Sequence, residues 1–122
     1  MKQKLLIIDD ETILTELLYD HFNTCGYLVY TANNGREAAS LLSVQPDLIL
    51  LDIKMPEMNG IEALKEIRKK DTNIPIIMQS AYAFENDMEA ARAAGSNGFI
   101  TKPINIVELK KTISKFLPQI IW

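Results

Sequence analysis

Acidic, hydroxyl and ammonium side chains stand shortly after the ends of four of the short apolar runs in this chain of 122 residues. They are Asp9, Asp10 and Glu11 after the first run, Asp52 after the third, Ser80 after the fourth and Lys102 after the fifth. If the runs are strands of a parallel sheet, their carboxyl ends meet at one edge, where ligands of such sheets bind. The spacing therefore predicts that these side chains gather into one site.

The chemistry of this group suits a magnesium ion and a phosphoryl group. Carboxylates crowded together repel one another unless a cation lies between them. Mg²⁺ takes one or two carboxylates, keeps several waters and completes its shell with phosphate oxygens. The ammonium of Lys102 could hold a phosphoryl group as a point charge, and the hydroxyl of Ser80 could hydrogen-bond to it. Together these parts indicate phosphoryl chemistry in which a carboxylate is the nucleophile.

Each residue of the group also has an ordinary structural interpretation. Asp9 or Asp10 could cap the helix that follows. Asp52 could be a turn residue. Ser80 could be a loop hydroxyl and Lys102 a solvated surface charge. None of these interpretations explains why all of the residues fall on the same edge, so the combination favours a functional site.

The elements that must position these residues follow from the hydrophobic pattern. The apolar runs are rich in Leu, Ile and Val, and each is too short for a helix and too continuous for a half-exposed strand, which predicts strands covered on both faces. The runs are residues 5–8, 28–30, 48–51, 76–78 and 99–100.

Segments with helical spacing alternate with these runs. The apolar stripes are Ile13, Leu14, Leu17, Leu18 and Phe22 in the first, Ile61, Leu64 and Ile67 in another, and Leu109, Ile113, Phe116 and Leu117 near the end. Residues 38–42 make a shorter stripe, and residues 87–94 have a face that is mostly Ala, which predicts a lightly anchored helix. Five strands and five helices in alternation predict an α/β fold, a parallel sheet with helices on both sides.

Length and composition exclude several classes of protein. Residues 1–122 fit one domain. The balance of 13 Lys+Arg and 16 Asp+Glu gives a net charge of −3, which argues against direct nucleic-acid binding because phosphate backbones need a basic face. No apolar run approaches the length of a membrane helix. The single Cys25 forms no internal disulfide, which is consistent with a reducing compartment. These features predict a cytoplasmic protein.

Several motifs at once resemble the receiver domain of bacterial two-component response regulators. The matching pieces are residues 7–11, 46–56 with 59–60, 75–78 with 80–81, 94–95 and 98–103. The resemblance covers essentially the whole chain. The stretches 80–83 and 98–104 are most similar to receivers attached to hybrid sensor kinases.

The resemblance implies a role for each residue of the group. Asp52 would accept the phosphoryl group from a phosphohistidine on a partner, a histidine kinase or a phosphotransfer domain. Asp9 and Asp10 would hold Mg²⁺, with Asp52 and the backbone carbonyl of Lys54 as further ligands. The remaining site residues would be Ser80 and Lys102, which would bind the phosphoryl oxygens. The protein would be a signalling domain and not an enzyme, catalysing only its own phosphorylation and slow autodephosphorylation.

The resemblance also implies structural details that coordinates can test. The fold would be the flavodoxin-like doubly wound sheet of five parallel strands in the order 2-1-3-4-5, with five helices. The peptide bond that joins Lys102 to Pro103 would be cis. Phosphorylation would draw Ser80 inward, and Phe99 would turn into the vacated space and switch an output surface near it.

Other classes of protein fit the pattern less well. A phosphatase of the haloacid-dehalogenase kind needs Asp-x-Asp with its nucleophile after the first strand, whereas Asp52 follows the third. A flavodoxin-like flavin binder needs a phosphate loop rich in Ser, Thr and Gly where this chain has three acidic residues. No Walker loop or dinucleotide glycine pattern is present. A receiver that acts only as an unphosphorylated docking module would not need the complete acidic set.

Overall fold

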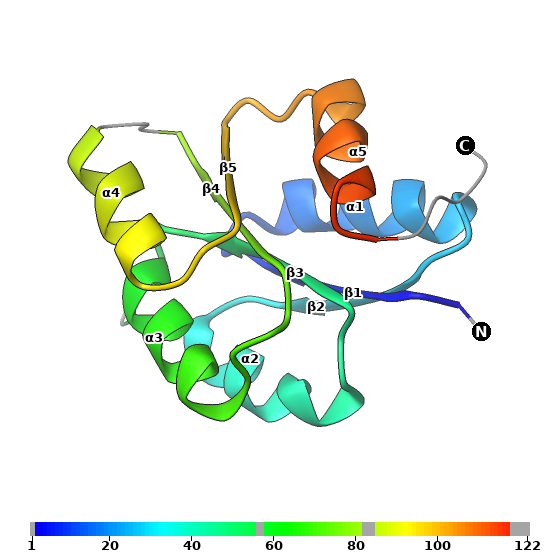
Figure 1. The fold of residues 1–122 in the computed structure, drawn as a ribbon. Coiled ribbons are helices and arrows are strands. Elements are labelled where there is room, and N and C mark those ends of the chain that lie inside the picture. Colours follow the sequence, from blue (N-terminus) through cyan, green and yellow to red (C-terminus); the bar gives the residue numbers. More distant parts are fainter. Residues whose placement is uncertain (1, 56–57, 82–84, 118–122) are drawn as a thin grey trace.

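A five-stranded parallel sheet between two layers of helices forms the fold of the computed structural model, which describes residues 2–55, 58–81 and 85–117 (Figure 1). The strands are β1 (Lys4–Ile8), β2 (Leu28–Ala32), β3 (Leu48–Asp52), β4 (Ile76–Ser80) and β5 (Gly98–Thr101). The α-helices are α1 (Thr12–Thr24), α2 (Gly35–Leu41), α3 (Gly60–Lys70), α4 (Glu85–Ala93) and α5 (Ile106–Ser114), and a 3₁₀ turn, η1, covers Leu42–Val44.

The strand order confirms the predicted fold class. The sheet runs β2-β1-β3-β4-β5, and every neighbouring pair is parallel. The direction of strand order reverses beside β1, which creates a switch point between β1 and β3 where ligands bind in sheets of this kind. The peptide bond between Lys102 and Pro103 is cis, as predicted.

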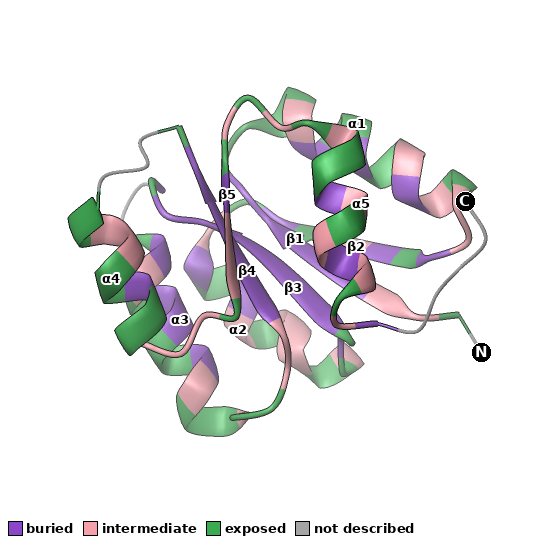
Figure 2. Ribbon diagram, turned by 45° about the horizontal axis from the view of Figure 1, so that its top comes forward, coloured by how far each residue is buried: buried purple, intermediate pink, exposed green. Residues whose placement is uncertain are grey.

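Side chains of alternating residues in the strands pack into two cores, one on each face of the sheet. Figure 2 shows the buried residues concentrated in the strands at the centre of the sheet. Helices α1 and α5 cover one face, with Leu18, Phe22, Leu109 and Ile113 buried against it. Helices α2, α3 and α4 cover the other. The three central strands, β1, β3 and β4, are buried almost throughout because helices lie above and below them. This rigid centre ends at the edge where the predicted site residues lie.

The prediction that all five strands are covered on both faces is wrong for the two outer strands. Leu28 and Thr31 of β2 are exposed, and β5 buries only Ile100 fully. Both strands lie at the ends of the sheet, so each has a strand neighbour on one side only. The predicted light anchoring of α4 is confirmed, since Ala91 is its one fully buried residue.

The predicted apolar stripe of α1 is wrong in part. Leu18 and Phe22 point into the core, but the side chains of Ile13 and Leu17 are 78% and 63% exposed. The buried face of the helix is instead shared with Thr15, whose hydroxyl donates to the carbonyl of Thr12. Two large apolar side chains one helical turn apart are therefore left in solvent.

Local features fix the loop that follows β3. Asn59 caps α3 by accepting a hydrogen bond from the backbone N–H of Glu62. The N–H of Gly60 donates to the carbonyl of Ile53 at 2.7 Å. A Cβ atom on Gly60 would overlap the backbone of Asp52, so the first turn of α3 approaches the end of β3 as closely as only glycine permits.

No helix among the described residues is long and apolar enough to cross a membrane.

Candidate functional site

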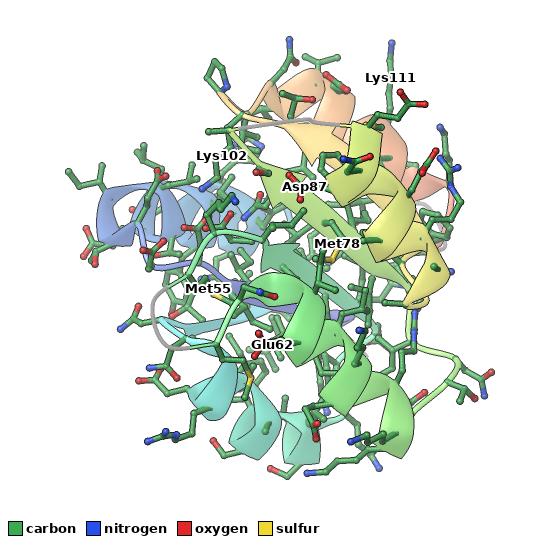
Figure 3. The ribbon with its side chains drawn as sticks, turned by 90° about the vertical axis from the view of Figure 1, so that its left-hand side faces the viewer. Met55, Glu62, Met78, Asp87, Lys102 and Lys111 are labelled. Atoms are coloured by element: carbon green, nitrogen blue, oxygen red, sulfur yellow. The ribbon has the colours of Figure 1, made fainter. Side chains whose placement is uncertain are left out.

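The end of each central strand places one of the predicted residues at the same edge of the sheet. Asp9 follows β1 directly, Asp52 is the last residue of β3 and Ser80 is the last residue of β4. Lys102 follows β5, and its backbone N–H donates to the carbonyl of Ser80 at 2.8 Å. Figure 3 looks onto this edge, where Lys102 is labelled.

Three carboxylates converge at the edge as the sequence predicted. Asp9, Asp10 and Asp52 each offer an oxygen, and these oxygens lie within 4.8 Å of one another. Asp9 and Asp52 are buried, with 0% and 2% of their surfaces exposed, whereas Asp10 is exposed. The group is therefore open to solvent on the Asp10 side and closed on the side of the sheet.

The ammonium of Lys102 lies among the acidic side chains. Its Nζ is 2.8 Å from Asp9 Oδ2, 3.0 Å from Glu11 Oε1 and 3.6 Å from Asp52 Oδ2. Burial by itself lowers the pKa of Lys102, but the hydrogen bonds to Asp9 and Glu11 and the negative charges of Asp52 and Asp9 outweigh it. The pKa is thus raised above its ordinary value, and the lysine is charged throughout the physiological range.

The carboxyl of Asp52 is shifted in the direction of its neutral form. Burial raises its pKa, the charge of Asp9 raises it further, and Asp10 adds to the effect. The ammonium of Lys102 and the hydrogen bond from the backbone N–H of Lys54 act in the opposite direction. The balance places the pKa of Asp52 at about 7. The single ammonium of Lys102 does not neutralise the buried negative charge, so a further cation at the site would be electrostatically favourable.

These oxygens fit a divalent ion of the hard type. Carboxylates are the ligands that Mg²⁺ takes, and the exposed Asp10 leaves an open side for the waters that the ion keeps. A cation here would offset the repulsion that raises the pKa of Asp52. The donor set therefore suits Mg²⁺ on chemical grounds. The assignment of the Lys54 carbonyl as a ligand stays a prediction.

The structure places the two remaining predicted residues next to this group. Ser80 is fully buried and pairs with Thr101 across β4 and β5. Phe99 is half-buried in β5, opposite Met78, and packs against the core that α2, α3 and α4 cover. Ser80 and Phe99 therefore lie on adjacent strands, as the predicted switch requires. The movement of these two side chains on phosphorylation stays a prediction.

Sequence reasoning missed one residue of the site. Gln79 is 1% exposed, and its Nε2 donates to Asp9 Oδ2 at 2.9 Å. It stands in β4 beside Asp52 of β3. The available signal was a polar residue inside an otherwise apolar strand, directly before Ser80. Glu11 was noticed as acidic, but its pairing with Lys102 was not predicted.

Comparison with known proteins gives one consistent family. The family model described as "Response regulator receiver domain" matches residues 5–114. Sporulation initiation phosphotransferase F of Bacillus subtilis is 37% identical over 119 residues, which cover 97% of this chain and 96% of that protein. Regulatory protein AtoC of Escherichia coli is 40% identical over 116 residues, but the chain spans only 25% of its length.

Solved structures agree with the sequence relatives. Chemotaxis protein CheY4 of Vibrio cholerae matches with a TM-score of 0.91 and 30% identity, over 96% of this chain and 100% of that chain. Response regulator protein TrrA of Thermotoga maritima, in complex with Mg(2+)-BeF, matches with a TM-score of 0.84 and 37% identity, over 94% of this chain and 99% of that chain.

The raised pKa of Asp52 predicts how replacing it changes stability with pH. The ordinary pKa of the carboxyl is 3.8 and the folded value is about 7, so the folded state holds the proton more tightly than the unfolded state. Wild-type stability therefore falls between those two values as the pH rises, and Asp52→Asn removes this loss.

Thermal unfolding in buffer with a chelator checks this expectation. The difference in melting temperature between Asp52→Asn and the wild type should increase steadily from pH 4 to pH 7 and then level off. Each kcal/mol of difference in the free energy of unfolding corresponds to roughly 4 °C. A difference in melting temperature that stays constant over this range would show that the pKa of Asp52 is not raised in the folded state.

Proposed function

Because the chain belongs to the family of response regulator receiver domains, we propose that Asp52 is its phosphoacceptor and that Asp9, Asp10 and Asp52 bind the Mg²⁺ that the reaction needs. The observation that carries this proposal is the convergence of the three carboxylates, with oxygens within 4.8 Å, around one buried lysine at the ends of the strands. The family membership argues against the phosphatase and flavin-binding alternatives.

The proposed reaction is an in-line transfer between two nucleophiles. An oxygen of Asp52 attacks the phosphorus of a phosphohistidine on the partner, the phosphorus–nitrogen bond breaks, and the electron pair of that bond returns to the imidazole. The product on this chain is an aspartyl phosphate. Bound Mg²⁺ supplies positive charge to the oxygens of the transferring group. Asp52 must be ionised to attack, which the cation favours because it offsets the charges of Asp9 and Asp10.

The neighbouring side chains have distinct parts in this proposal. Lys102 already lies 3.6 Å from Asp52 Oδ2, so a short movement away from Asp9 brings its ammonium to a phosphoryl oxygen. Ser80 donates its hydroxyl to another of these oxygens. The backbone carbonyl of Lys54 serves as a further metal ligand. When Ser80 is drawn inward, Phe99 on the adjoining strand turns and changes the surface near β5.

The scope of the proposal follows from the relatives. Receiver domains interact with kinases or phosphotransfer proteins, and we take a histidine kinase or a phosphotransfer domain in the cytoplasm as the phosphoryl donor. Residues 1–122 would form one receiver domain, a signalling module whose catalysis is limited to its own phosphorylation and slow autodephosphorylation. The domain itself would make no direct contact with nucleic acid, which its net charge of −3 disfavours. A receiver of the hybrid sensor kinase type stays a prediction.

The exposed apolar side chains of α1 support a docking surface for the phosphoryl donor. Helix α1 begins at Thr12, two residues after Asp10, and Ile13 and Leu17 lie on its outer face. Val107, near the start of α5, is 63% exposed. Helices α1 and α5 lie on the same side of the sheet (Figure 1). A helical donor resting its own apolar residues here would hold its phosphohistidine next to Asp52.

Replacing Ile13 or Leu17 by Glu should therefore slow transfer from a protein donor. We expect kcat/KM for transfer from an autophosphorylated histidine kinase that acts on the wild type to fall by roughly 10-fold, the effect of losing a central interface contact. Phosphorylation by acetyl phosphate should be unchanged, because a small donor needs no docking surface. Leu28→Glu is the control, because Leu28 is an exposed apolar residue at the first position of β2, where the strands begin and away from the edge that carries the site. Equal transfer rates in all variants would contradict the docking proposal.

The central assignment is tested by acetyl phosphate and Mg²⁺ alone. Intact-mass spectrometry should show the addition of one phosphoryl group to the wild type and none to Asp52→Asn. Chelation of the metal should prevent the addition. An unchanged mass in the wild type, or equal labelling of Asp52→Asn, would overturn the assignment of the phosphoacceptor.

A further inference from the structure

The side-chain amide of Gln79 is buried at the proposed metal site, and within the residues that the structure describes its nitrogen forms a hydrogen bond while its oxygen does not. Gln79 is 1% exposed and lies in β4 beside Asp52 of β3. Its Nε2 donates to Asp9 Oδ2 at 2.9 Å, while its Oε1 is buried and has no hydrogen-bond partner among the described residues. The other residues of β4 before Ser80, which are Ile76, Ile77 and Met78, are apolar and equally buried.

The orientation of this amide is fixed by its partner. An ionised carboxylate only accepts hydrogen bonds, so the NH₂ group of Gln79 must face Asp9 and the carbonyl oxygen must face away. A buried acceptor without a donor destabilises the fold, and this loss offsets the gain from the hydrogen bond that Nε2 makes. An apolar side chain at position 79 would serve the core at least as well. The contribution of Gln79 is therefore to be sought at Asp9.

Asp9 is held by three donors of different kinds. Its Oδ1 accepts from the backbone N–H of Glu11 at 2.9 Å, and its Oδ2 accepts from Lys102 at 2.8 Å as well as from Gln79. Lys102 is shared with Glu11 and Asp52, and in the proposed reaction it moves to a phosphoryl oxygen. Gln79 is neutral, lies on a central strand and directs its amide N–H to Asp9.

We propose that Gln79 is a positioning residue for metal binding: its side-chain amide holds the Asp9 carboxylate in place for Mg²⁺, both while Lys102 is beside Asp9 and after Lys102 moves to the phosphoryl group. The inference rests on the proposed function, because it concerns the same metal. A neutral donor suits this task, since it orients the carboxylate without competing with the cation through charge. Removing it leaves Asp9 with a single fixed contact, at Oδ1, once the lysine has moved.

Titration of the unphosphorylated protein with Mg²⁺ by calorimetry tests the proposal. In Gln79→Met, which keeps the volume but has no donor, the dissociation constant for Mg²⁺ should rise by roughly 10- to 100-fold, the usual effect of losing a partner of a metal ligand. The melting temperature without metal should stay the same or increase, because the unpartnered Oε1 is lost as well. A purely structural hydrogen bond would give the opposite pattern, lower stability with unchanged affinity.

A matched control exists at the other end of the sheet. Gln3, just before β1, also has a buried Oε1 without a partner in the described part of the chain. Gln3→Met should leave the affinity for Mg²⁺ unchanged. Gln79→Leu repeats the test with a second side chain that lacks a donor. With acetyl phosphate, the concentration of Mg²⁺ that gives half the maximal rate should rise in both position-79 variants, while the rate at saturating Mg²⁺ stays close to that of the wild type.

The outcomes separate the two proposals. If the wild type and both variants bind Mg²⁺ equally well, the role of Gln79 is overturned and the proposed function stands. If the wild type binds no Mg²⁺, the proposed function fails and the inference fails with it. A weaker affinity that is accompanied by an equal loss of stability without metal would make Gln79 a structural residue and overturn the inference.

Discussion

The burial of two carboxylates at the end of a parallel sheet is the constraint on which the site depends. Asp9 and Asp52 are almost completely removed from solvent, and both face the same ammonium of Lys102. Desolvation and mutual repulsion raise the pKa of Asp52 to about 7, so a single lysine compensates for the buried charge only in part. The same imbalance favours the binding of a cation, and we propose that the bound cation in turn favours a transferring phosphoryl group.

The fold creates this imbalance through its topology. Parallel strands bring residues that lie far apart in the sequence to one edge, and the order 2-1-3-4-5 puts β1 and β3, which carry Asp9 and Asp52, side by side. Gly60 lets α3 approach the backbone of Asp52. Gln79 reaches Asp9 from β4, although β3 lies between β4 and β1 in the sheet. The central strands therefore hold Asp9 and Asp52 in place, while the exposed Asp10 and Glu11 leave this edge of the sheet open to solvent.

Much of this arrangement was predictable from the sequence because strand ends in a parallel sheet have a common location. Asp9, Asp10, Asp52 and Lys102 were expected together and are found together. The outward orientation of Ile13 and Leu17 was not predicted, because periodicity cannot show which of two adjacent apolar faces meets the sheet. The contact of Gln79 with Asp9 depends on the register between neighbouring strands, and a hydrophobic pattern does not encode that register. The exposure of residues in β2 and β5 depends on the strand order, which places these two strands at the ends of the sheet and which apolar runs do not encode.

Mg²⁺-dependent thermal stabilisation tests most directly the claim that the three carboxylates form one cation site. Binding to the folded state raises the melting temperature by linkage. Asp10→Ala removes an exposed ligand at little expense to the fold, whereas Glu11→Ala removes an adjacent exposed carboxylate that pairs with Lys102 and lies outside the trio. We expect Mg²⁺ to stabilise the wild type and Glu11→Ala and to have no effect on Asp10→Ala. Stabilisation that survives in Asp10→Ala, or that is absent from the wild type, would contradict the account.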